Sequence, residues 1–394
     1  MERENKRRQI MLIVPMLDQG GLERVCAQTA QLLKDVCEVH LVVFNTAGMI
    51  YDVSGVHLID LELGAVSGRA GKALNVVRRV RRVRKLKKEL GIALSYSFGP
   101  TANLVNVLSR HTEITWAGIR GYGALSSRAS MKLVCGLADR VISCTCVMEQ
   151  EIVRQFHPKQ SAVLYNPCDI GQIAAQSALG TPPEFDGFFA RGGKTVVSMG
   201  RAHDVKGFWH LIKAVSLVRK DVGDVKLMIV GAGDYQEYKK LAEALGMGAD
   251  VLFAGMQQNP FAFLRRADVY ALTSQSEGFP NALIEAMACG LPCISANCKT
   301  GPAEILQEDY TLCADQNCVH YAKYGILTPV FQGDKDLNPE HVTAEEEIFA
   351  RELKKMLTDD AYYGHYREMA AERARRFGTQ QYLGNLTKLM GKEW

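Results

Sequence analysis

The sequence has no long apolar run, no large excess of one charge and no cysteines spaced like a disulfide framework. No stretch approaches the roughly 18 consecutive apolar residues that a membrane-spanning helix needs. The formal net charge of +4 is small for 394 residues, so it does not by itself indicate a nucleic-acid-binding protein. Eleven scattered cysteines fit a reducing compartment better than disulfide bonds. We therefore expect a cytoplasmic protein, and we interpret the short apolar run at residues 10–14 as a buried strand rather than a signal peptide.

The composition and the length are those of an ordinary globular protein with two domains. Apolar residues make up 47% of the chain and charged residues 23%, which argues against a disordered or fibrous protein. A chain of 394 residues suits two domains of roughly 180 residues better than one core. Short apolar strands alternate with helical patterns, as in α/β proteins whose parallel sheets are covered on both faces. The expected strands are residues 9–15, 37–44, 92–97, 114–118, 140–143, 162–165, 195–200, 226–231, 251–254, 269–273 and 292–296.

A segment without clear strand or helix periodicity separates the two halves. Residues 171–194 are interrupted by glycines and prolines, which are typical of a connection between domains. We therefore expect an N-terminal domain at 1–175, a linker at 176–193 and a C-terminal domain at 194–370. Residues 371–394 are expected to form a C-terminal helix that packs back on the N-terminal domain.

Two glutamates after the expected strand at 269–273 form the strongest candidate site. Glu277 precedes an expected helix, and Glu285 lies about a turn and a half inside it. Backbone N–H groups at the start of that helix, from Gly278 to Leu283, would favour a phosphate. As lone residues, the two glutamates would more often be a helix-dipole partner and a solvated surface residue.

The residues around the two glutamates change that interpretation. The segment at 276–292, SEGFPNALIEAMACGLP, resembles the donor-site motif of glycosyltransferase family 4. The resemblance implies a retaining enzyme of the GT-B fold, in which two Rossmann-like domains with parallel sheets face a central cleft for a nucleotide sugar. It also implies that Glu277 binds sugar hydroxyls, that Glu285 binds the ribose, and that the backbone between them holds sugar and phosphate. The implied donor-binding residues of this segment are Gly278, Phe279, Pro280, Asn281, Ala282, Leu283 and Glu285.

A second motif opens the C-terminal half of the chain. Arg201 and Lys206 lie on the loop after the strand at 195–200, and two cations there suit a diphosphate, because arginine offers a planar fork and lysine a point charge. The segment matches the Gly-Arg…Lys-Gly motif of the same family. The resemblance implies that the two cations neutralise the departing nucleotide diphosphate, and that they form the catalytic set with Glu277. As isolated surface cations they would carry no such meaning.

Three weaker sites complete the candidate list. Gly20 and Gly21 follow the first strand, where paired glycines let the backbone approach a phosphate, although such pairs usually mark only a turn. Family members carry a similar loop that reaches the donor, and the resemblance implies that Gly255 and Met256 touch the nucleobase. Arg120 lies where many members place a histidine beside the sugar, which makes it a candidate on the acceptor side. A solvated arginine after a strand is an equal alternative.

Eight of the eleven residues from Arg78 to Lys88 are basic. Apolar residues recur every three or four positions there, which predicts a helix that packs one stripe and exposes its cations. A solvated face is the plain interpretation. Anionic lipid attracts such helices by roughly 1 kcal/mol per cation, so peripheral docking on the inner face of a membrane is an equal alternative, and nucleic acid is not expected because no aromatic platform accompanies the charge. The expected stripe is Leu74, Val77, Val80, Val83, Leu86 and Leu90, and the expected exposed cations are Arg78, Arg79, Arg81, Arg82, Arg84, Lys85, Lys87 and Lys88.

No metal site is expected, because the donor-site segment contains no Asp-x-Asp motif and Cys313, Cys318 and His320 are not spaced like a zinc site. We also expect no cofactor beyond the nucleotide-sugar substrate. The resulting hypothesis is a retaining hexosyl- or N-acetylhexosaminyltransferase that moves a sugar from a nucleotide diphosphate donor, taken as UDP, to a glycan or lipid-linked acceptor in cell-surface polysaccharide or glycoconjugate synthesis. Two alternatives stay open: a nucleotide-sugar epimerase of the same architecture, and a non-enzymatic basic protein that binds membrane or nucleic acid.

Overall fold

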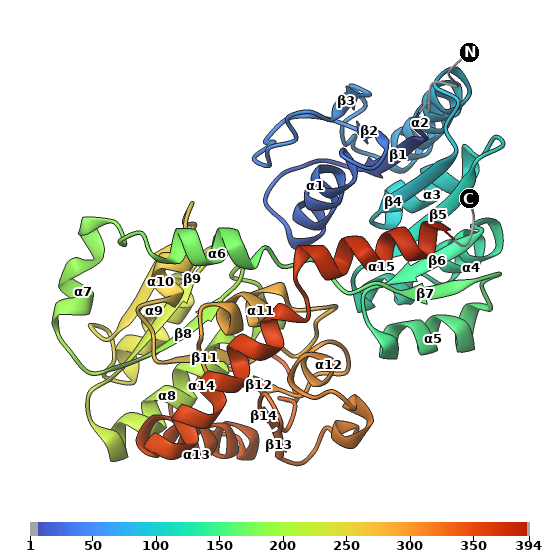
Figure 1. Cartoon of the computed structure of the whole chain (residues 1–394). Coiled ribbons are helices and arrows are strands. Elements are labelled where there is room, and N and C mark those ends of the chain that lie inside the picture. The colour runs from blue at the N-terminus through green and yellow to red at the C-terminus, as the bar shows by residue number, and fades with distance from the viewer. Residues whose placement is uncertain (1–6, 392–394) are drawn as a thin grey trace. The chain divides into compact units, whose positions relative to one another are not determined.

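The computed structural model describes residues 7–391, which fold into two compact units (Figure 1). Unit 1 comprises the chain up to Pro167 together with the segment from Thr379 onward, and unit 2 comprises Cys168–Gly378. Each unit is built on a seven-stranded, largely parallel sheet with helices between its strands. The expected α/β class is therefore confirmed.

The sheet of unit 1 has the strand order β3-β2-β1-β4-β5-β6-β7, and all its neighbouring strands are parallel. Its strands are β1 (Gln9–Val14), β2 (Glu38–Val43), β3 (His57–Asp60), β4 (Leu94–Phe98), β5 (Ile114–Ile119), β6 (Arg140–Ser143) and β7 (Ser161–Val163). Its helices are α1 (Gly21–Leu33), α2 (Arg69–Glu89), α3 (Pro100–Leu108), η1 (Tyr122–Ser126), α4 (Arg128–Leu137), α5 (Cys146–Phe156) and α15 (Thr379–Gly391).

After Gln9, the central strand β1 is apolar and buried because both faces of the sheet are covered. Ile10, Leu12 and Val14 belong to a core that includes residues of α1 and α15. Met11 and Ile13 point to the other face and pack in a core with residues of α2 and α3. Successive strand residues face opposite ways, so burial on both sides turns an alternating pattern into a continuous apolar run.

The sheet of unit 2 has the order β10-β9-β8-β11-β12-β14-β13, with one antiparallel pair, β13 and β14, at its edge. Its strands are β8 (Lys194–Met199), β9 (Val225–Val230), β10 (Val251–Gly255), β11 (Val269–Leu272), β12 (Cys293–Ala296), β13 (His320–Ala322) and β14 (Gly325–Thr328). Its helices are α6 (Ile170–Ser177), η2 (Pro183–Phe185), α7 (Asp186–Ala190), η3 (Asp204–Lys206), α8 (Phe208–Val222), α9 (Gln236–Ala244), α10 (Pro260–Leu264), α11 (Asn281–Ala288), α12 (Pro302–Leu306), η4 (Tyr310–Cys313), α13 (Ala344–Thr358) and α14 (Asp360–Arg375). One core joins the strands to α8, α9 and α13.

The segment that we expected to be a linker, residues 176–193, is folded as part of unit 2. The ring of Phe185 packs edge-on against Phe263 at 5.0 Å, and Lys226 donates to the backbone carbonyl of Phe188 at 2.9 Å. The boundary of unit 1 lies earlier than residue 175, because the backbone N–H of Cys168 already bonds to Phe377 O at 2.8 Å. Aromatic residues between the prolines and glycines explain why the segment packs on a core.

The C-terminal helix α15 belongs to unit 1 although the helix before it, α14, belongs to unit 2. Tyr382, Leu386 and Met390 are spaced four residues apart on α15 and are buried in the core beside α1. The hydroxyl of Tyr382 also shares a hydrogen bond of 2.7 Å with that of Thr29 on α1. These contacts fix α15 on unit 1.

Candidate functional site

The two strongest predicted motifs lie on neighbouring strands of unit 2. The loop with Arg201 and Lys206 follows β8, and the loop with Glu277 follows β11, which pairs with β8. From β8 the chain proceeds outward to β9 and β10 and then returns to β11 on the other side. The strand order therefore reverses between β8 and β11, and ligands of open α/β sheets bind at the carboxyl ends of strands at such a point.

A carboxylate and an ammonium group meet at this edge of the sheet. Lys206 Nζ donates to Glu277 Oε1 at 2.6 Å, and the two side chains are 23% and 11% exposed. Ser274 Oγ donates to the same carboxylate oxygen at 2.6 Å. Thr300, after β12, donates its hydroxyl to the backbone carbonyl of Glu277. Glu277 is therefore held at its side chain and its backbone by groups from three loops.

The loops after β8 and β11 are also joined through their backbones. Gln275 N–H donates to Val205 O at 2.9 Å, and Thr273 Oγ1 donates to Lys206 O at 3.1 Å. Gly207 has a φ of 61°, and a Cβ there would overlap the carbonyl oxygen of Thr273. The glycine after Lys206 thus permits the close approach that pairs Lys206 with Glu277.

The sequence analysis did not identify Ser274, Thr300 or Thr273 as site residues. Their hydroxyls position Glu277 and the loop with Lys206 rather than carry charge. Serine and threonine are common in loops and no spacing singled them out. Only Ser274 could have been suspected, since it lies three residues before Glu277 on the same loop.

Arg201 is exposed on the same loop as Lys206. Further along this loop, Asp204 is 3.2 Å from Lys335 Nζ. The loop also packs tightly against the end of β9: Gly231 has a φ of 152°, and a Cβ there would overlap the carbonyl oxygen of Gly200. This close approach explains why residue 231 is a glycine.

Helix α11 begins at Asn281 with Pro280 as its N-cap. Fewer backbone N–H groups are therefore free to face a phosphate than we expected. The N–H of Leu283 donates to Pro280 O at 3.0 Å, and proline itself has no N–H group. The N–H of Leu283 is thus used within the helix, and the predicted contacts of Pro280 and Leu283 with the donor stay untested. The contribution of Gly278, Phe279, Asn281 and Ala282 stays a prediction.

The predicted ribose and nucleobase residues occupy different environments. Glu285 is buried in unit 2, and burial, with the nearby charge of Glu285, raises the pKa of the Cys289 thiol to about 12. Met256 is 51% exposed after β10. Gly255 has a φ of 68°, and its carbonyl accepts from the N–H of Gly231 at 2.8 Å. The ends of β9 and β10 therefore meet beside the loop after β8.

In unit 1, Gly20 is the N-cap of α1 and Gly21 is its first residue. Tyr51 donates its hydroxyl to Gly20 O at 2.9 Å. A Cβ at Gly20 would overlap the carboxylate of Glu23, so this acidic side chain already lies at the start of the helix. A carboxylate is favourable there because it faces the positive end of the helix dipole.

The predicted acceptor-side residue Arg120 is buried directly after β5. Its guanidinium donates to Leu164 O at 2.9 Å, to Asn166 Oδ1 at 2.9 Å and to the hydroxyl of Tyr96. These contacts disagree with the alternative of a solvated arginine. They also direct the side chain into unit 1, so an acceptor contact by Arg120 stays a prediction.

The buried and exposed faces of the basic helix α2 differ from those predicted. Arg79 and Lys87 are buried: Arg79 donates to Leu63 O and Gly64 O, and Lys87 Nζ lies 2.7 Å from the buried carboxylate of Glu113. Burial lowers the pKa of Lys87 to about 8 despite the opposing effect of Glu113. Six cations are exposed as expected: Arg78, Arg81, Arg82, Arg84, Lys85 and Lys88.

Two residues of the predicted apolar stripe of α2 are instead on its surface. Leu74 is 51% exposed and Val77 is 43% exposed. Leu74 precedes Arg78 by four residues and Val77 precedes Arg81 by four, so these apolar residues lie on the same helix face as exposed cations. No helix within residues 7–391 is long and apolar enough to cross a membrane.

The structure assembles no obvious cation site in the part that it describes. Among residues 7–391, no group of three or more His, Cys, Asp or Glu side chains is arranged to hold a metal ion. Cys318 Sγ lies 3.4 Å from His320 Nε2, and Cys313 is buried. That the reaction needs no metal stays a prediction.

Comparison with known proteins relates part of the chain to a family of glycosyltransferases. Residues 184–326 match the family model of the glycosyl transferases group 1. Over 383 residues the chain is 26% identical to the N-acetylgalactosamine-N,N'-diacetylbacillosaminyl-diphospho-undecaprenol 4-alpha-N-acetylgalactosaminyltransferase of Campylobacter jejuni, which covers 93% of this chain and 94% of that protein. It is 34% identical to an uncharacterized glycosyltransferase of Methanocaldococcus jannaschii over 202 residues, which span 50% of this chain and 48% of the relative.

Solved structures show the same fold. The structure of Anabaena HepE in complex with UDP and glucose matches with a TM-score of 0.73 at 18% identity, covering 98% of this chain and 100% of that one. The lipopolysaccharide outer core galactosyltransferase WaaB matches with a TM-score of 0.70 at 17% identity, covering 98% and 100%. Residues 184–326 thus form a group 1 glycosyltransferase domain, and the chain has the GT-B fold.

Proposed function

We propose that this glycosyltransferase transfers a hexose or N-acetylhexosamine from a UDP-sugar, with retention of configuration, to a glycan on a lipid carrier. The observation that carries the proposal is the Lys206–Glu277 pair at the carboxyl ends of β8 and β11. It brings a cation for phosphate and a carboxylate for sugar hydroxyls to one point of the sheet, as a nucleotide sugar requires.

The chemical role of the cations follows from the charge of the leaving group. When the bond between the anomeric carbon and the β-phosphate oxygen breaks, negative charge grows on UDP. Lys206 and Arg201 would stabilise that charge, Lys206 as a point charge and Arg201 as a planar fork. Such preorganised groups act without a metal, and we propose that the reaction needs no divalent cation.

The carboxylate has a positioning role in this proposal. Lys206 and Ser274 both donate to Glu277 Oε1, so Oε2 is the oxygen that can accept from a hydroxyl of the donor sugar. The acceptor hydroxyl then attacks on the face from which UDP departs. Its proton passes to the β-phosphate oxygen, so one bond to the anomeric carbon forms and one breaks on the same face, which retains the configuration.

Relatives support the nucleotide and the acceptor class. HepE was solved with UDP and with UDP-glucose, and the Campylobacter relative is named for an acceptor on diphospho-undecaprenol. Several further relatives are named for lipopolysaccharide or amylovoran synthesis. We propose a role in cell-surface polysaccharide or glycoconjugate synthesis at the cytoplasmic side of the membrane.

Binding and turnover of nucleotide sugars test the proposal. UDP and UDP-sugars should raise the midpoint of thermal unfolding, because a ligand that binds only the folded state stabilises it. The wild-type protein should release UDP from one UDP-sugar in the presence of a lipid-linked glycan acceptor. Failure of all nucleotides to bind would contradict the proposal, and epimerised sugar from donor alone would favour an epimerase.

We further propose that the exposed face of α2 docks on an anionic membrane. Leu74 and Val77 lie toward the start of the helix, and the six exposed cations lie toward its end. At roughly 1 kcal/mol per cation near an anionic surface, six cations supply several kcal/mol. Exposed apolar side chains can add to this by entering the interface.

Vesicle sedimentation tests the docking. The protein should bind vesicles that contain phosphatidylglycerol, should not bind pure phosphatidylcholine vesicles, and should dissociate as salt rises. Replacing Arg81, Arg84 and Lys85 by glutamine should abolish binding, whereas Lys239→Gln with Lys240→Gln, exposed on α9 of unit 2, should not. Equal binding by both variants would contradict the role of α2.

A further inference from the structure

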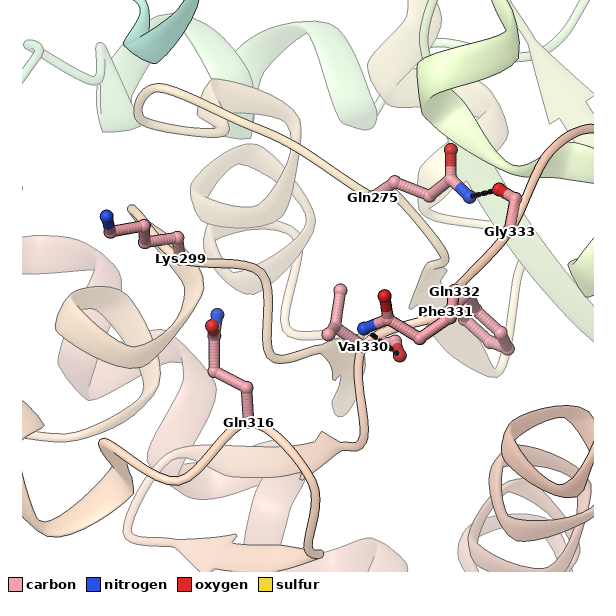
Figure 2. A pocket seen from close by; sticks show the side chains of 7 residues that line it. All are labelled: Gln275, Lys299, Gln316, Val330, Phe331, Gln332 and Gly333. Carbon is pink, nitrogen blue, oxygen red and sulfur yellow. Dashed lines mark hydrogen bonds between the residues drawn. The ribbon is translucent and has the colours of Figure 1, made fainter.

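Unit 2 has a polar pocket beside the predicted donor site, with a volume of about 320 Å³ (Figure 2). Its wall is formed after three neighbouring strands: Gln275 follows β11, Lys299 follows β12, and residues 330–333 follow β14. Gln316 closes another side. None of the residues predicted for the donor belongs to this wall. The pocket nevertheless opens at the sheet edge where α/β proteins bind ligands.

The polar side chains of the wall are mostly amides of fixed orientation. Gln275 Nε2 donates to Gly333 O at 2.9 Å, and Gln316 Nε2 donates to Asn297 O at 2.7 Å. Gln332 Nε2 donates to Val330 O at 3.4 Å. Each amide keeps an oxygen and a second N–H for other partners. Figure 2 shows these amides around the same space, with the side chain of Lys299 nearby.

The segment after β14 is anchored by a buried aromatic contact. Phe331 is buried and stacks on the ring of His210 at 4.2 Å with an interplanar angle of 13°. His210 Nδ1 in turn lies 2.6 Å from Glu346 Oε1, and both side chains are almost fully buried. This stack links the segment to α8 and α13, so the backbone next to Gln332 is anchored on the core.

Two of the loops that form the pocket wall also hold Glu277. Gln275 lies two residues before Glu277 on the same loop, and Lys299 precedes Thr300, whose hydroxyl bonds the Glu277 carbonyl. We propose that this pocket binds a sugar ring of the acceptor glycan. The inference rests on the proposed function, because only a glycosyl transfer brings a second sugar next to the donor sugar at Glu277.

The chemistry and the size of the pocket fit one sugar ring. Amides both donate and accept, as vicinal hydroxyls require, and Lys299 adds donors for a hydroxyl or an acidic substituent. Most pockets of this size are lined by apolar side chains, whereas the side chains of Gln275, Gln316, Gln332 and Lys299 make this wall polar. At roughly 30 Å³ per water, the volume corresponds to roughly ten water-sized atoms, which is about one sugar ring.

Saturation-transfer NMR with methyl glycosides tests the proposal. The probes are the methyl glycosides of glucose, galactose, N-acetylglucosamine, N-acetylgalactosamine and glucuronic acid, each with saturating UDP so that the donor site is filled. At least one glycoside should bind. Combining Gln316→Ala with Gln332→Ala should weaken its binding about five-fold or more, since each lost hydrogen bond is worth roughly 2- to 12-fold. Gln381→Ala, exposed on α15 of unit 1, is the matched control and should change nothing.

A blocking variant gives a second measurement. Gln332→Trp should fill the pocket and abolish glycoside binding, while the affinity for UDP should stay within two-fold, roughly, of the wild type. If UDP binds but no glycoside does, or if binding is unchanged in both pocket variants, the pocket proposal is overturned and the donor site stands. If UDP itself does not bind, the proposed function fails first.

Discussion

Replacing each residue of the Lys206–Glu277 pair in turn should distinguish the role of the lysine from that of the glutamate. Replacing Glu277 by glutamine keeps the shape of the side chain but removes the negative charge that Lys206 and Ser274 stabilise at Oε1. Replacing Lys206 by methionine keeps the stem and removes the cation. Both side chains are partly exposed, at 11% and 23%, so the loss of stability should be smaller than the roughly 3–5 kcal/mol of a fully buried pair.

The effect on catalysis should be much larger than the effect on folding. Removing one group that stabilises a transition state costs roughly 100- to 1,000-fold in kcat, or about 2.7–4 kcal/mol. Lys206→Met should also weaken UDP binding, because the lysine is assigned to phosphate. Glu277→Gln should leave UDP affinity nearly unchanged and lower kcat, because the glutamate is assigned to the sugar. In the double variant the loss should be less than the sum of the two single losses, since the residues act together.

Steady-state kinetics with a UDP-sugar measure kcat, calorimetric titration measures the affinity for UDP, and circular dichroism measures the folded fraction. Full activity in either purified single variant would refute the assignment. A loss of UDP affinity in Glu277→Gln equal to that in Lys206→Met would show that the carboxylate acts only by holding the lysine. Activity lost in step with the folded fraction would mean that the pair is structural.

Three further outcomes are expected. Lys87→Met should lower the free energy of unfolding by about 3–5 kcal/mol, measured by urea titration, because it leaves the buried Glu113 carboxylate without its cation; replacing both partners by apolar residues should recover part of the loss. Gly231→Ala should lower UDP affinity and thermal stability, because its Cβ would overlap the Gly200 carbonyl and force the two loops apart. Chelation by EDTA should leave the initial rate unchanged, and activity restored by adding back a divalent cation would contradict metal independence.

Much of the fold could be predicted because the central strands are buried on both faces. β1, β2, β8 and β9 are rich in apolar residues and begin within a residue of their expected positions. β3 and β13 were missed because they are short edge strands with exposed or half-buried residues. β14, with four buried residues, was also missed.

The faces of α2 show what periodicity cannot provide. A helical stripe is assigned from residues three or four positions apart, but Arg79 and Lys87 are buried by partners elsewhere in the chain. Arg79 meets carbonyls 15 and 16 residues earlier, and Lys87 bonds the side chain and the carbonyl of Asn106, 19 residues later. These hydrogen bonds allow Arg79 and Lys87 to occupy buried positions of the helix where apolar side chains were expected. Leu74 and Val77 lie on the surface instead.

The donor site shows the same division between local and distant causes. Arg201, Lys206 and Glu277 could be chosen from the sequence because each carries charge in a recognisable motif. The hydroxyl of Thr300 meets the Glu277 backbone across 23 residues, and the stack of Phe331 on His210 spans still more of the chain. Positioning groups of this kind have no sequence signature. They depend on strand order, which brings the ends of β11, β12 and β14 to one edge.

One carboxylate can serve both the nucleotide and the sugar because its two oxygens have different partners. With Lys206 and Ser274 on Oε1, the charge of Glu277 is stabilised without a ligand, and its orientation is set by Thr300 through the backbone. A diphosphate that attracts Lys206 would weaken one of these bonds, and the carboxylate charge that is then less neutralised would make Oε2 a better acceptor for a sugar hydroxyl. Binding of the phosphates would then favour binding of the sugar at the same residue, which couples recognition of the two halves of the donor within unit 2.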